Sequence, residues 1–484
     1  MAGYTLALDG GTTAMKAFLY DPDGKLVGSA ERELSMYYPA SDRVEQDPTE
    51  IADKARTVLA AALANARVDA SELGAIGITN QRSSIVAWDA RTLRPVSPMI
   101  IWQDTRAAAR CDELQAQGFF ITPQMAASKA EWIVANCDEA KDAAAAGALR
   151  FGLPGSWLVA ALAGDAHVCD YGNASVSGFY SYFENCWDTA ALAAMNLEPE
   201  WLPRLVDSSG VFAETRPDIL GRAVPIASMA GDQQSSLFGL GCAAPGETKC
   251  SYGTSAMVTA STGSEIAVGG AGTFPIVAWR IDGELTLSLE GQVYTAGAAV
   301  QWLRDGLGII DAAEESGPLA ESVASSGGVW AVPAFQGLGT PGMNGDARAL
   351  VGGVSRSTTR AEIVRAVLEG VAHRVADAAE AVWEYGGRSA TLRADGGASR
   401  NTFLMQTQAD LLGVPVAVAA TPDGAAFGAA KLAGLATGVW TDADGLGAMW
   451  NPGRVYEPRL DEAARVQARS LWAKRFELCL AAAV

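Results

Sequence analysis

The feature that most constrains the fold is a five-residue segment that occurs twice, with Ser in place of one Thr in the second copy. Gly11-Thr12-Thr13-Ala14-Met15 reappears as Gly253-Thr254-Ser255-Ala256-Met257, and runs typical of β-strands flank both copies. The copies begin 242 residues apart in a chain of 484 residues, which is half its length. Two turns of one kind at this spacing predict two similarly folded domains that face one cleft. No shorter period accompanies them, which excludes a solenoid.

The order of strand and helix patterns predicts the fold class. Tyr4–Leu8 has the pattern of a short strand, and Asp47-Pro48 has the residues that begin a helix. In the second half, Thr359-Arg360-Ala361-Glu362 forms a capping box ahead of a long helical pattern. Strand and helix patterns then alternate over residues 391–419. This alternation predicts an α/β protein.

The charge balance limits the partners of the chain. Lys and Arg total 36 against 55 Asp and Glu, so the net charge is −19 at pH 7. Nucleic acids and anionic membranes require clustered Lys and Arg, so we expect neither as a partner. Hydrophobic residues make up 49% of the chain, enough for a large core and against wholesale disorder.

Cysteine and histidine usage indicates a reducing environment without structural zinc. The seven cysteines are scattered without a CxxC pair, and His167 and His373 are isolated. This pattern excludes zinc-ligand spacing and a disulfide framework, and we expect both histidines to be structural. The sequence starts with a strand pattern, without a signal-type segment or a long apolar run, so a cytoplasmic protein is expected.

The two Gly-Thr turns are candidate phosphate sites. Such turns present backbone N–H groups and hydroxyls to an anion, although either turn alone could be a plain hairpin. Asp9, beside the first turn, could hold the Mg²⁺ of a nucleotide or simply form the turn. The chain has no Walker A sequence, and the GxGxxG match at Gly337–Gly342 does not open a βαβ unit.

Asp232 is the candidate base. It lies in Met229–Gln234, a run of small and polar residues that we expect to be a loop. An Asp in this place could accept the proton of an attacking hydroxyl during phosphoryl transfer. It could equally cap a helix, and residue chemistry alone leaves both roles open.

In this order along the chain, the motifs resemble the FGGY carbohydrate kinases, and within that family the glycerol kinases. The resemblance implies two RNase H-like domains of the actin and hexokinase type that flank an ATP cleft. Residues 1–245 would form the N-terminal domain, with the acceptor site and the first phosphate turn. Residues 246–484 would form the C-terminal domain, which binds ATP and its adenosine. The matching segments are Leu8–Thr13, Ala75–Arg82, Ile101–Gln103, Asp170–Ser175, Ala230–Gln234, Tyr252–Thr254, Ala296–Ala298, Gln301–Asp305, Ala349–Glu369 and Asp395–Ala398.

The resemblance also implies which residues bind Mg-ATP. Asp9 and Asp232 would lie on the metal side. Lys16 stands where glycerol kinases usually have Arg. A compact ammonium group would therefore replace a planar guanidinium near the phosphates. The remaining expected contacts are Thr12, Thr13, Gly253 and Thr254 for the phosphates, and Gln301, Gly396, Gly397 and Asn401 for the adenosine.

The implied acceptor pocket departs from that of glycerol kinases at three positions. Ser83 replaces a Glu, Gln124 a Tyr and Met257 a Phe. Sites that hydrogen-bond a substrate hydroxyl discriminate steeply, so these changes affect the choice of acceptor. The other expected acceptor contacts are Arg82, Trp102, Asp232 and Gln233.

We therefore expect an ATP-dependent kinase that phosphorylates a terminal hydroxyl of a small polyol or sugar, with domain closure over Mg-ATP. Glycerol ranks first as acceptor. A larger polyol or a ketopentose such as xylulose is the alternative, although Gln81-Arg82-Ser83 differs from the Gln-Met-His usual in xylulokinases. The non-enzyme alternative is an actin-like or sensory nucleotide-binding relative without transferase activity.

Two further expectations concern regulation and assembly. Some bacterial relatives use a Gly-Lys-Gly-Gly loop for inhibition by fructose bisphosphate, and this loop is missing around Gly221-Arg222. We therefore expect no such inhibition. Dimers are common in the family, which leaves a homodimer open as the assembly.

Overall fold

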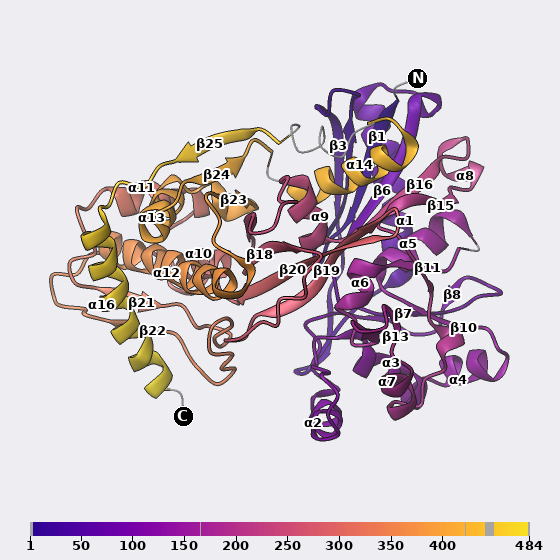
Figure 1. Ribbon diagram of the computed structural model, residues 1–484, viewed down its shortest axis with the longest axis horizontal. Helices are drawn as coiled ribbons and strands as arrows, with labels where there is room; N and C mark the ends of the chain where they lie inside the picture. The colour runs from indigo at the N-terminus through magenta and orange to yellow at the C-terminus, as the bar shows by residue number, and fades with distance from the viewer. Residues whose placement is uncertain (1–2, 165, 422, 441–449, 483–484) are drawn as a thin grey trace. The chain divides into compact units, whose positions relative to one another are not determined.

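The computed structural model describes residues 3–164, 166–421, 423–440 and 450–482, and it divides into two compact units (Figure 1). Within the described ranges, unit 1 consists of Met1–Gly239, Val277–Leu285 and Ala425–Met449. Unit 2 consists of Leu240–Ile276, Thr286–Gly424 and Trp450–Val484. Each unit is built on a large mixed β-sheet.

A six-stranded sheet forms the centre of unit 1, with the order β15-β16-β6-β1-β2-β3 among the described residues. β1, β6 and β16 are parallel neighbours. Antiparallel strands flank them, because β2 pairs with β1, β3 with β2, and β15 with β16. The bounds are β1 (Tyr4–Gly10), β2 (Ala14–Tyr20), β3 (Leu26–Glu33), β6 (Leu73–Asn80), β15 (Ser209–Glu214) and β16 (Pro225–Gly231).

The sheet of unit 2 repeats this pattern over β20-β18-β17-β23-β24-β25. β17, β23 and β24 are parallel neighbours, and β18, β20 and β25 add antiparallel strands on either side. The two Gly-Thr turns occupy equivalent places, since one joins β1 to β2 and the other β17 to β18. The predicted α/β class with two RNase H-like sheets is confirmed. The bounds are β17 (Thr248–Tyr252), β18 (Ala256–Gly263), β20 (Glu284–Val293), β23 (Leu392–Asp395), β24 (Val416–Ala419) and β25 (Pro452–Tyr456).

Helices α1 (Pro48–Ala66) and α5 (Pro154–Ala163) pack together on the apolar core of the first sheet. α1 begins as predicted, because the Asp47 side chain accepts from the Thr49 N–H at 2.8 Å and Pro48 is the first helical residue. The Trp157 indole donates to the Pro48 carbonyl at 2.8 Å, which ties the start of α1 to α5.

Helix α14 (Gly424–Thr437) packs on the opposite face of the same sheet. Ile76 of β6 belongs to the core under α1, whereas Ala75 packs with Ala433 of α14, as the alternation of side chains along a strand requires. A Cβ at Gly77 would lie 2.2 Å from the Ala429 carbonyl oxygen. The glycine therefore permits the backbone of α14 to lie directly on the strand.

Helix α12 (Arg360–Gly386) is the central helix of unit 2. It has the predicted capping box of Thr359 and Glu362, and Gly387 is its C-cap. The Trp383 indole donates to Thr248 Oγ1 at 2.9 Å and anchors α12 on β17. Three more helices of this unit are α10 (Gly297–Gln301), α13 (Thr402–Leu412) and α16 (Glu462–Ala481).

Both histidines have structural roles, as predicted. His167 bonds the Phe151 carbonyl at 2.7 Å, and burial lowers its pKa to about 4. His373 of α12 stacks on Trp472 of α16 at 4.6 Å between ring centroids, and burial also lowers its pKa.

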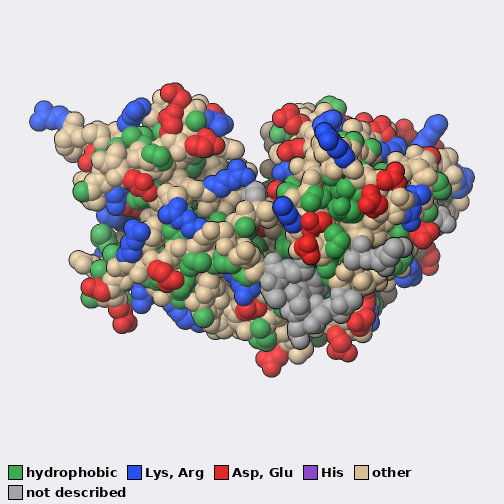
Figure 2. Space-filling view, turned by 90° about the horizontal axis from the view of Figure 1, so that it is seen from above, with side chains coloured by type: hydrophobic (Ala, Val, Ile, Leu, Met, Phe, Trp, Pro, Cys, Tyr) green, Lys and Arg blue, Asp and Glu red, His purple; other side chains and the backbone are tan. Residues whose placement is uncertain are grey.

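The surface of the described residues carries charges of both signs. Figure 2 shows Lys and Arg side chains intermingled with Asp and Glu over the face in view. No helix in the described part of the chain is long and apolar enough to cross a membrane. All seven cysteines are free thiols.

Candidate active site

The carboxyl ends of three parallel strands in unit 1 meet at one edge of the sheet. Gly10 of β1 lies opposite Asn80 of β6, and Asn80 lies opposite Gly231 of β16. The segments that follow these strands therefore start side by side. Ligands of open α/β sheets bind outside the carboxyl ends of the strands, so this edge is the candidate site of unit 1.

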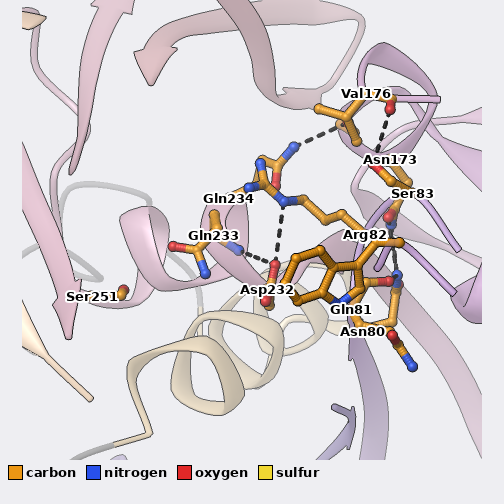
Figure 3. A network of polar contacts seen from close by, with 12 residues as sticks. Asn80, Gln81, Arg82, Ser83, Asn173, Val176, Asp232, Gln233, Gln234 and Ser251 are labelled. Atoms are coloured by element: carbon orange, nitrogen blue, oxygen red, sulfur yellow. Dashed lines mark hydrogen bonds and ion pairs between the residues drawn. The ribbon is translucent and has the colours of Figure 1, made fainter. Parts of the chain in front are cut away.

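Asp232 and Arg82 meet at this edge (Figure 3). Arg82 Nε lies 3.4 Å from Asp232 Oδ1, and the Gln233 N–H donates to the same oxygen at 2.8 Å. The Asp232 side chain is 38% exposed and that of Arg82 11%. The Asp232 carboxylate is therefore accessible to a ligand. Its orientation is fixed by two donors, Arg82 Nε and the Gln233 N–H.

The predicted loop around Asp232 is absent, and that prediction was wrong. β16 runs to Gly231, and α9 (Asp232–Gly239) starts at the next residue. A Cβ at Gly231 would lie 2.8 Å from Cγ and Cδ of Arg82. The absence of a Cβ at Gly231 therefore permits the aliphatic part of Arg82 to cross the end of β16. Because the helix starts directly after the strand, Asp232 lies beside Arg82.

A hydrogen-bonded group links the first Gly-Thr turn to Trp102. The indole of Trp102 donates to Thr12 Oγ1 at 3.1 Å, and its backbone N–H donates to Ser84 Oγ at 3.1 Å. Ser84 also donates to Gln81 Oε1 at 3.1 Å. Gln46, at the end of β5 (Arg43–Gln46), donates to the Thr12 carbonyl at 2.8 Å and accepts from Gln81 at 2.9 Å.

Gln46 and Ser84 are supporting residues that the sequence did not single out. Gln46 is 1% exposed and Ser84 is fully buried. Buried polar side chains are normally hydrogen-bonded. Their partners, however, lie in segments distant along the chain, so no local pattern identifies them.

A second buried group fixes the end of β6 (Figure 3). Asn80 and Asn173 exchange hydrogen bonds between their carboxamides at 3.0 and 3.1 Å. Asn173 also donates to Asp170, which precedes α6 (Tyr171–Ser175). Gln234 of α9 donates to the Gly172 carbonyl at 3.0 Å. Both segments that carry the Arg82–Asp232 pair are thus fastened to α6.

Two of the divergent acceptor positions belong to unit 1. Ser83 has a left-handed backbone, with φ of 61°, and its hydroxyl donates to the Val176 carbonyl at 3.1 Å. Gln124 has an exposed side chain, and its carbonyl accepts from Lys129 at 2.7 Å. Met257, the third position, lies on β18 of unit 2.

The remaining predicted residues of unit 1 surround the first turn. Asp9 on β1 lies opposite Lys16 on β2 in the register of the hairpin. Lys16 Nζ lies 4.0 Å from Glu31 Oε1. Thr13 is exposed at the tip of the turn, and its carbonyl accepts from the Leu34 N–H at 2.8 Å.

Unit 2 has an equivalent strand edge of its own. Gly253 and Thr254 follow β17 and are exposed, and the Ala298 N–H at the start of α10 donates to the Thr254 carbonyl. Gly396 follows the neighbouring β23 with φ of 89°, and a Cβ there would lie 2.5 Å from the Tyr252 carbonyl oxygen. A Cβ at Gly397 would meet no atom within 4 Å, so the surface beside it is open.

Asn401 and Gln301 differ in their freedom to bind a ligand. Asn401 caps α13, since its Oδ1 accepts from the Leu404 N–H at 3.0 Å, and its Nδ2 donates to Ser316 at 3.0 Å. Both ends of this carboxamide therefore have structural bonds. Gln301 is exposed at the end of α10.

The acidic residues of the described chain fit a nucleotide-bound magnesium better than a protein-enclosed metal. No group of three or more His, Cys, Asp and Glu side chains suited to a metal occurs among the described residues. Mg²⁺ is usually held by one or two carboxylates together with phosphate oxygens and water. Asp9 lies on β1 and Asp232 directly follows β16, so each carboxylate stands at the carboxyl end of a parallel strand of unit 1.

Comparisons with known proteins identify the family of the chain. The FGGY family of carbohydrate kinases matches with its N-terminal domain over residues 4–239 and with its C-terminal domain over residues 248–437. The glycerol kinase of Carboxydothermus hydrogenoformans is 41% identical over 482 residues, which cover 97% of this chain and 96% of that protein.

Solved structures show the same fold. The crystal structure of Plasmodium falciparum glycerol kinase with ADP has a TM-score of 0.91 and 28% identity, covering 99% of this chain and 98% of that chain. A xyloylose kinase from Brucella ovis has a TM-score of 0.86 and 27% identity, covering 98% of both chains. The chain therefore belongs to the FGGY family of carbohydrate kinases and is an ATP-dependent carbohydrate or polyol kinase.

Proposed function

We propose that this kinase transfers the γ-phosphate of ATP to a terminal hydroxyl of a small polyol or sugar, with Asp232 as the general base. The observation that carries the proposal is the exposed Asp232 carboxylate, held by Arg82 and the Gln233 N–H at the strand edge. A base must reach the proton that it removes, and partial exposure at a strand edge meets this requirement.

The proposed reaction is an in-line transfer to an alcohol. The hydroxyl oxygen of the acceptor forms a new bond to the γ-phosphorus, and the bond to the β,γ-bridging oxygen breaks, leaving its electron pair on ADP. The hydroxyl proton moves to Asp232. Arg82 and the Gln233 N–H, which contact Oδ1, keep the carboxylate aimed at the acceptor.

For ATP, we assign residues from the two Gly-Thr turns and from the strand edge of unit 2. Asp9 would hold the Mg²⁺, with Asp232 as a second carboxylate, and the ion would neutralise charge on the phosphates. The open backbone at Gly396 and Gly397 offers a surface for the adenosine. Closure of the enzyme around Mg-ATP would exclude water as a competing acceptor. The other contacts are Thr12, Thr13, Lys16, Gly253 and Thr254 for the phosphates, and Gln301 and Asn401 for the adenosine.

Glycerol is the first candidate for the acceptor. Its support is the identity of about 41% with a glycerol kinase over nearly the whole chain. A ketopentose or a larger polyol is the second candidate, because Ser83 is small and neutral where glycerol kinases have a carboxylate, and because a xyloylose kinase shares the fold at 27% identity.

A coupled ADP-release assay tests the proposal. The enzyme is supplied with Mg-ATP and, in separate reactions, glycerol, erythritol, xylitol, xylulose or ribulose, with a reaction lacking acceptor as the control. We expect ADP release that depends on at least one acceptor, and kcat/KM then identifies the preferred one. ADP release that is the same with and without every acceptor would contradict the proposal.

A further inference from the structure

We propose that Lys129 is a positioning residue for the acceptor, because its buried amino group joins the two backbone segments that carry Ser83 and Gln124. This inference rests on the proposed function, which places both segments on the acceptor side. Lys129 lies on α3 (Ala126–Asn136) and is fully buried.

The contacts of Lys129 are to main-chain atoms. Its Nζ donates to the Ser83 carbonyl at 3.3 Å and to the Gln124 carbonyl at 2.7 Å. Ser83 is not a glycine, yet its φ of 61° lies in the left-handed region. Such a conformation persists when the surroundings hold it. Lys129 on the carbonyl and Val176 on the hydroxyl hold Ser83 from two sides.

The same helix also supports the segment of Trp102. Trp132 lies one turn after Lys129, and the guanidinium carbons of Arg43 and Arg106 lie 5.3 and 4.5 Å from the centre of its ring. Arg106 is 1% exposed at its side chain and pairs with the buried Asp104 at 2.7 Å. α3 thus contacts the Ser83 and Gln124 backbones through Lys129, and Arg106, four residues after Trp102, through Trp132.

Stability alone does not account for an amine at this position. Burial lowers the pKa of Lys129 to about 7, while the charge of Asp104 opposes the shift and that of Arg106 adds to it. An apolar side chain of similar length would avoid the cost of desolvating the amine. Unlike an apolar side chain, the amine donates a hydrogen bond to each of the Ser83 and Gln124 carbonyls. These two bonds fix the distance between the two segments.

The test compares Lys129→Met with Lys431→Met. Lys431 is an equally buried lysine of α14 that donates to the Gly239 carbonyl at 3.1 Å, at the opposite end of α9 from Asp232, so it is a matched control whose bond lies away from the Ser83 and Gln124 segments. Both variants are assayed for acceptor KM, ATP KM and kcat, with folding checked by circular dichroism. Lys129→Arg, which keeps donors at this position, is the rescue variant.

We expect Lys129→Met to raise the acceptor KM by about 10- to 100-fold, the scale of a misplaced binding group. The ATP KM should stay near the wild-type value, Lys431→Met should leave the acceptor KM unchanged, and Lys129→Arg should restore part of the loss. Should Lys129→Met not fold, Lys129→Gln is tested by the same criteria.

Three outcomes would overturn the inference: an unchanged acceptor KM, an equal rise in the ATP KM, or the same acceptor effect in Lys431→Met. Failure of both Lys129→Met and Lys129→Gln to fold, while Lys431→Met folds, would also overturn it in favour of a purely structural role. These outcomes are distinct from failure of the proposed function, in which the wild-type enzyme itself shows no acceptor-dependent ADP release.

Discussion

Asp170 is a buried acid near the candidate site whose ionisation is coupled to the fold. It is fully buried and accepts from the Gly172 N–H at 2.9 Å, from the Asn173 carboxamide at 2.7 Å and from the Ser208 hydroxyl at 3.1 Å. Burial outweighs these bonds and raises the pKa of Asp170 from 3.8 to about 6.

This shift predicts a defined pH dependence of stability. Between the two pKa values the native state binds more protons than the unfolded state, so the contribution of Asp170 to the free energy of unfolding is full below about pH 4 and is lost as the pH rises through about 6. The loss amounts to about 3 kcal/mol, at about 1.4 kcal/mol per pKa unit.

Urea unfolding of the wild type and Asp170→Asn across this pH range measures the effect. The Asn variant keeps the shape and lacks the titration, so its free energy of unfolding should fall less between about pH 4 and about pH 7. Parallel pH curves for the two proteins would show that Asp170 does not titrate in this window.

At the residue scale, sequence motifs identified candidate site residues, but they did not predict which other residues these would contact in the folded chain. Asp232 and Arg82 belong to segments that resemble kinase motifs, and the structure brings the two side chains together. The contacts of Gln46 and Lys129 were not predictable, because both residues bond segments that come close only after folding. The roles assigned to the site residues remain predictions.

Helices that begin with capping residues were predicted from the sequence. The packing of a helix on strands that are distant along the chain was not. The starts of α1 and α12 follow from Asp47 and from the Thr359 capping box, which act within a few residues. Helix α14 packs on β6 through residues that are about 350 positions apart in the sequence. The small residues at this contact are the only sequence feature that indicates the packing.

Gly77 gives the sharpest test of this packing. In Gly77→Ala, the new Cβ would lie 2.2 Å from the Ala429 carbonyl oxygen, so strand or helix backbone must shift. We expect a loss of about 1–3 kcal/mol in the free energy of unfolding, as for other overpacked cores. Gly345→Ala, where a Cβ meets no atom within 4 Å, is the control and should be nearly neutral. Equal stability of both variants in urea unfolding would contradict the described packing.

At the scale of the whole molecule, the repeated sheet explains why half the chain length separates the two Gly-Thr turns. Each turn joins the first antiparallel pair of its sheet, next to the parallel strands. This repeat was predictable because the turn requires small residues in a fixed order. The arrangement of the strands around each turn was not, since it depends on pairings across the whole unit.

Regulation is a second property of the whole enzyme that can be tested. Gly221 ends α8 (Pro217–Leu220), and Arg222 Nη1 donates to the carbonyls of Ala70 and Ser71 at 3.2 and 3.0 Å. The Arg222 guanidinium therefore has structural hydrogen bonds, and the segment lacks the Gly-Lys-Gly-Gly sequence. We expect excess fructose bisphosphate to leave turnover unchanged in the ADP-release assay, and a concentration-dependent loss of turnover would contradict this.

The most direct test of the central claim is the turnover of Asp232→Asn with the preferred acceptor. Asp207→Asn is the matched control, because Asp207 Oδ1 also lies 3.4 Å from an arginine Nε, that of Arg280. If Asp232 takes the hydroxyl proton, kcat should fall by about 10²- to 10⁴-fold while ATP binding is retained, and Asp207→Asn should turn over normally. Near-normal turnover of Asp232→Asn would show that another group is the base.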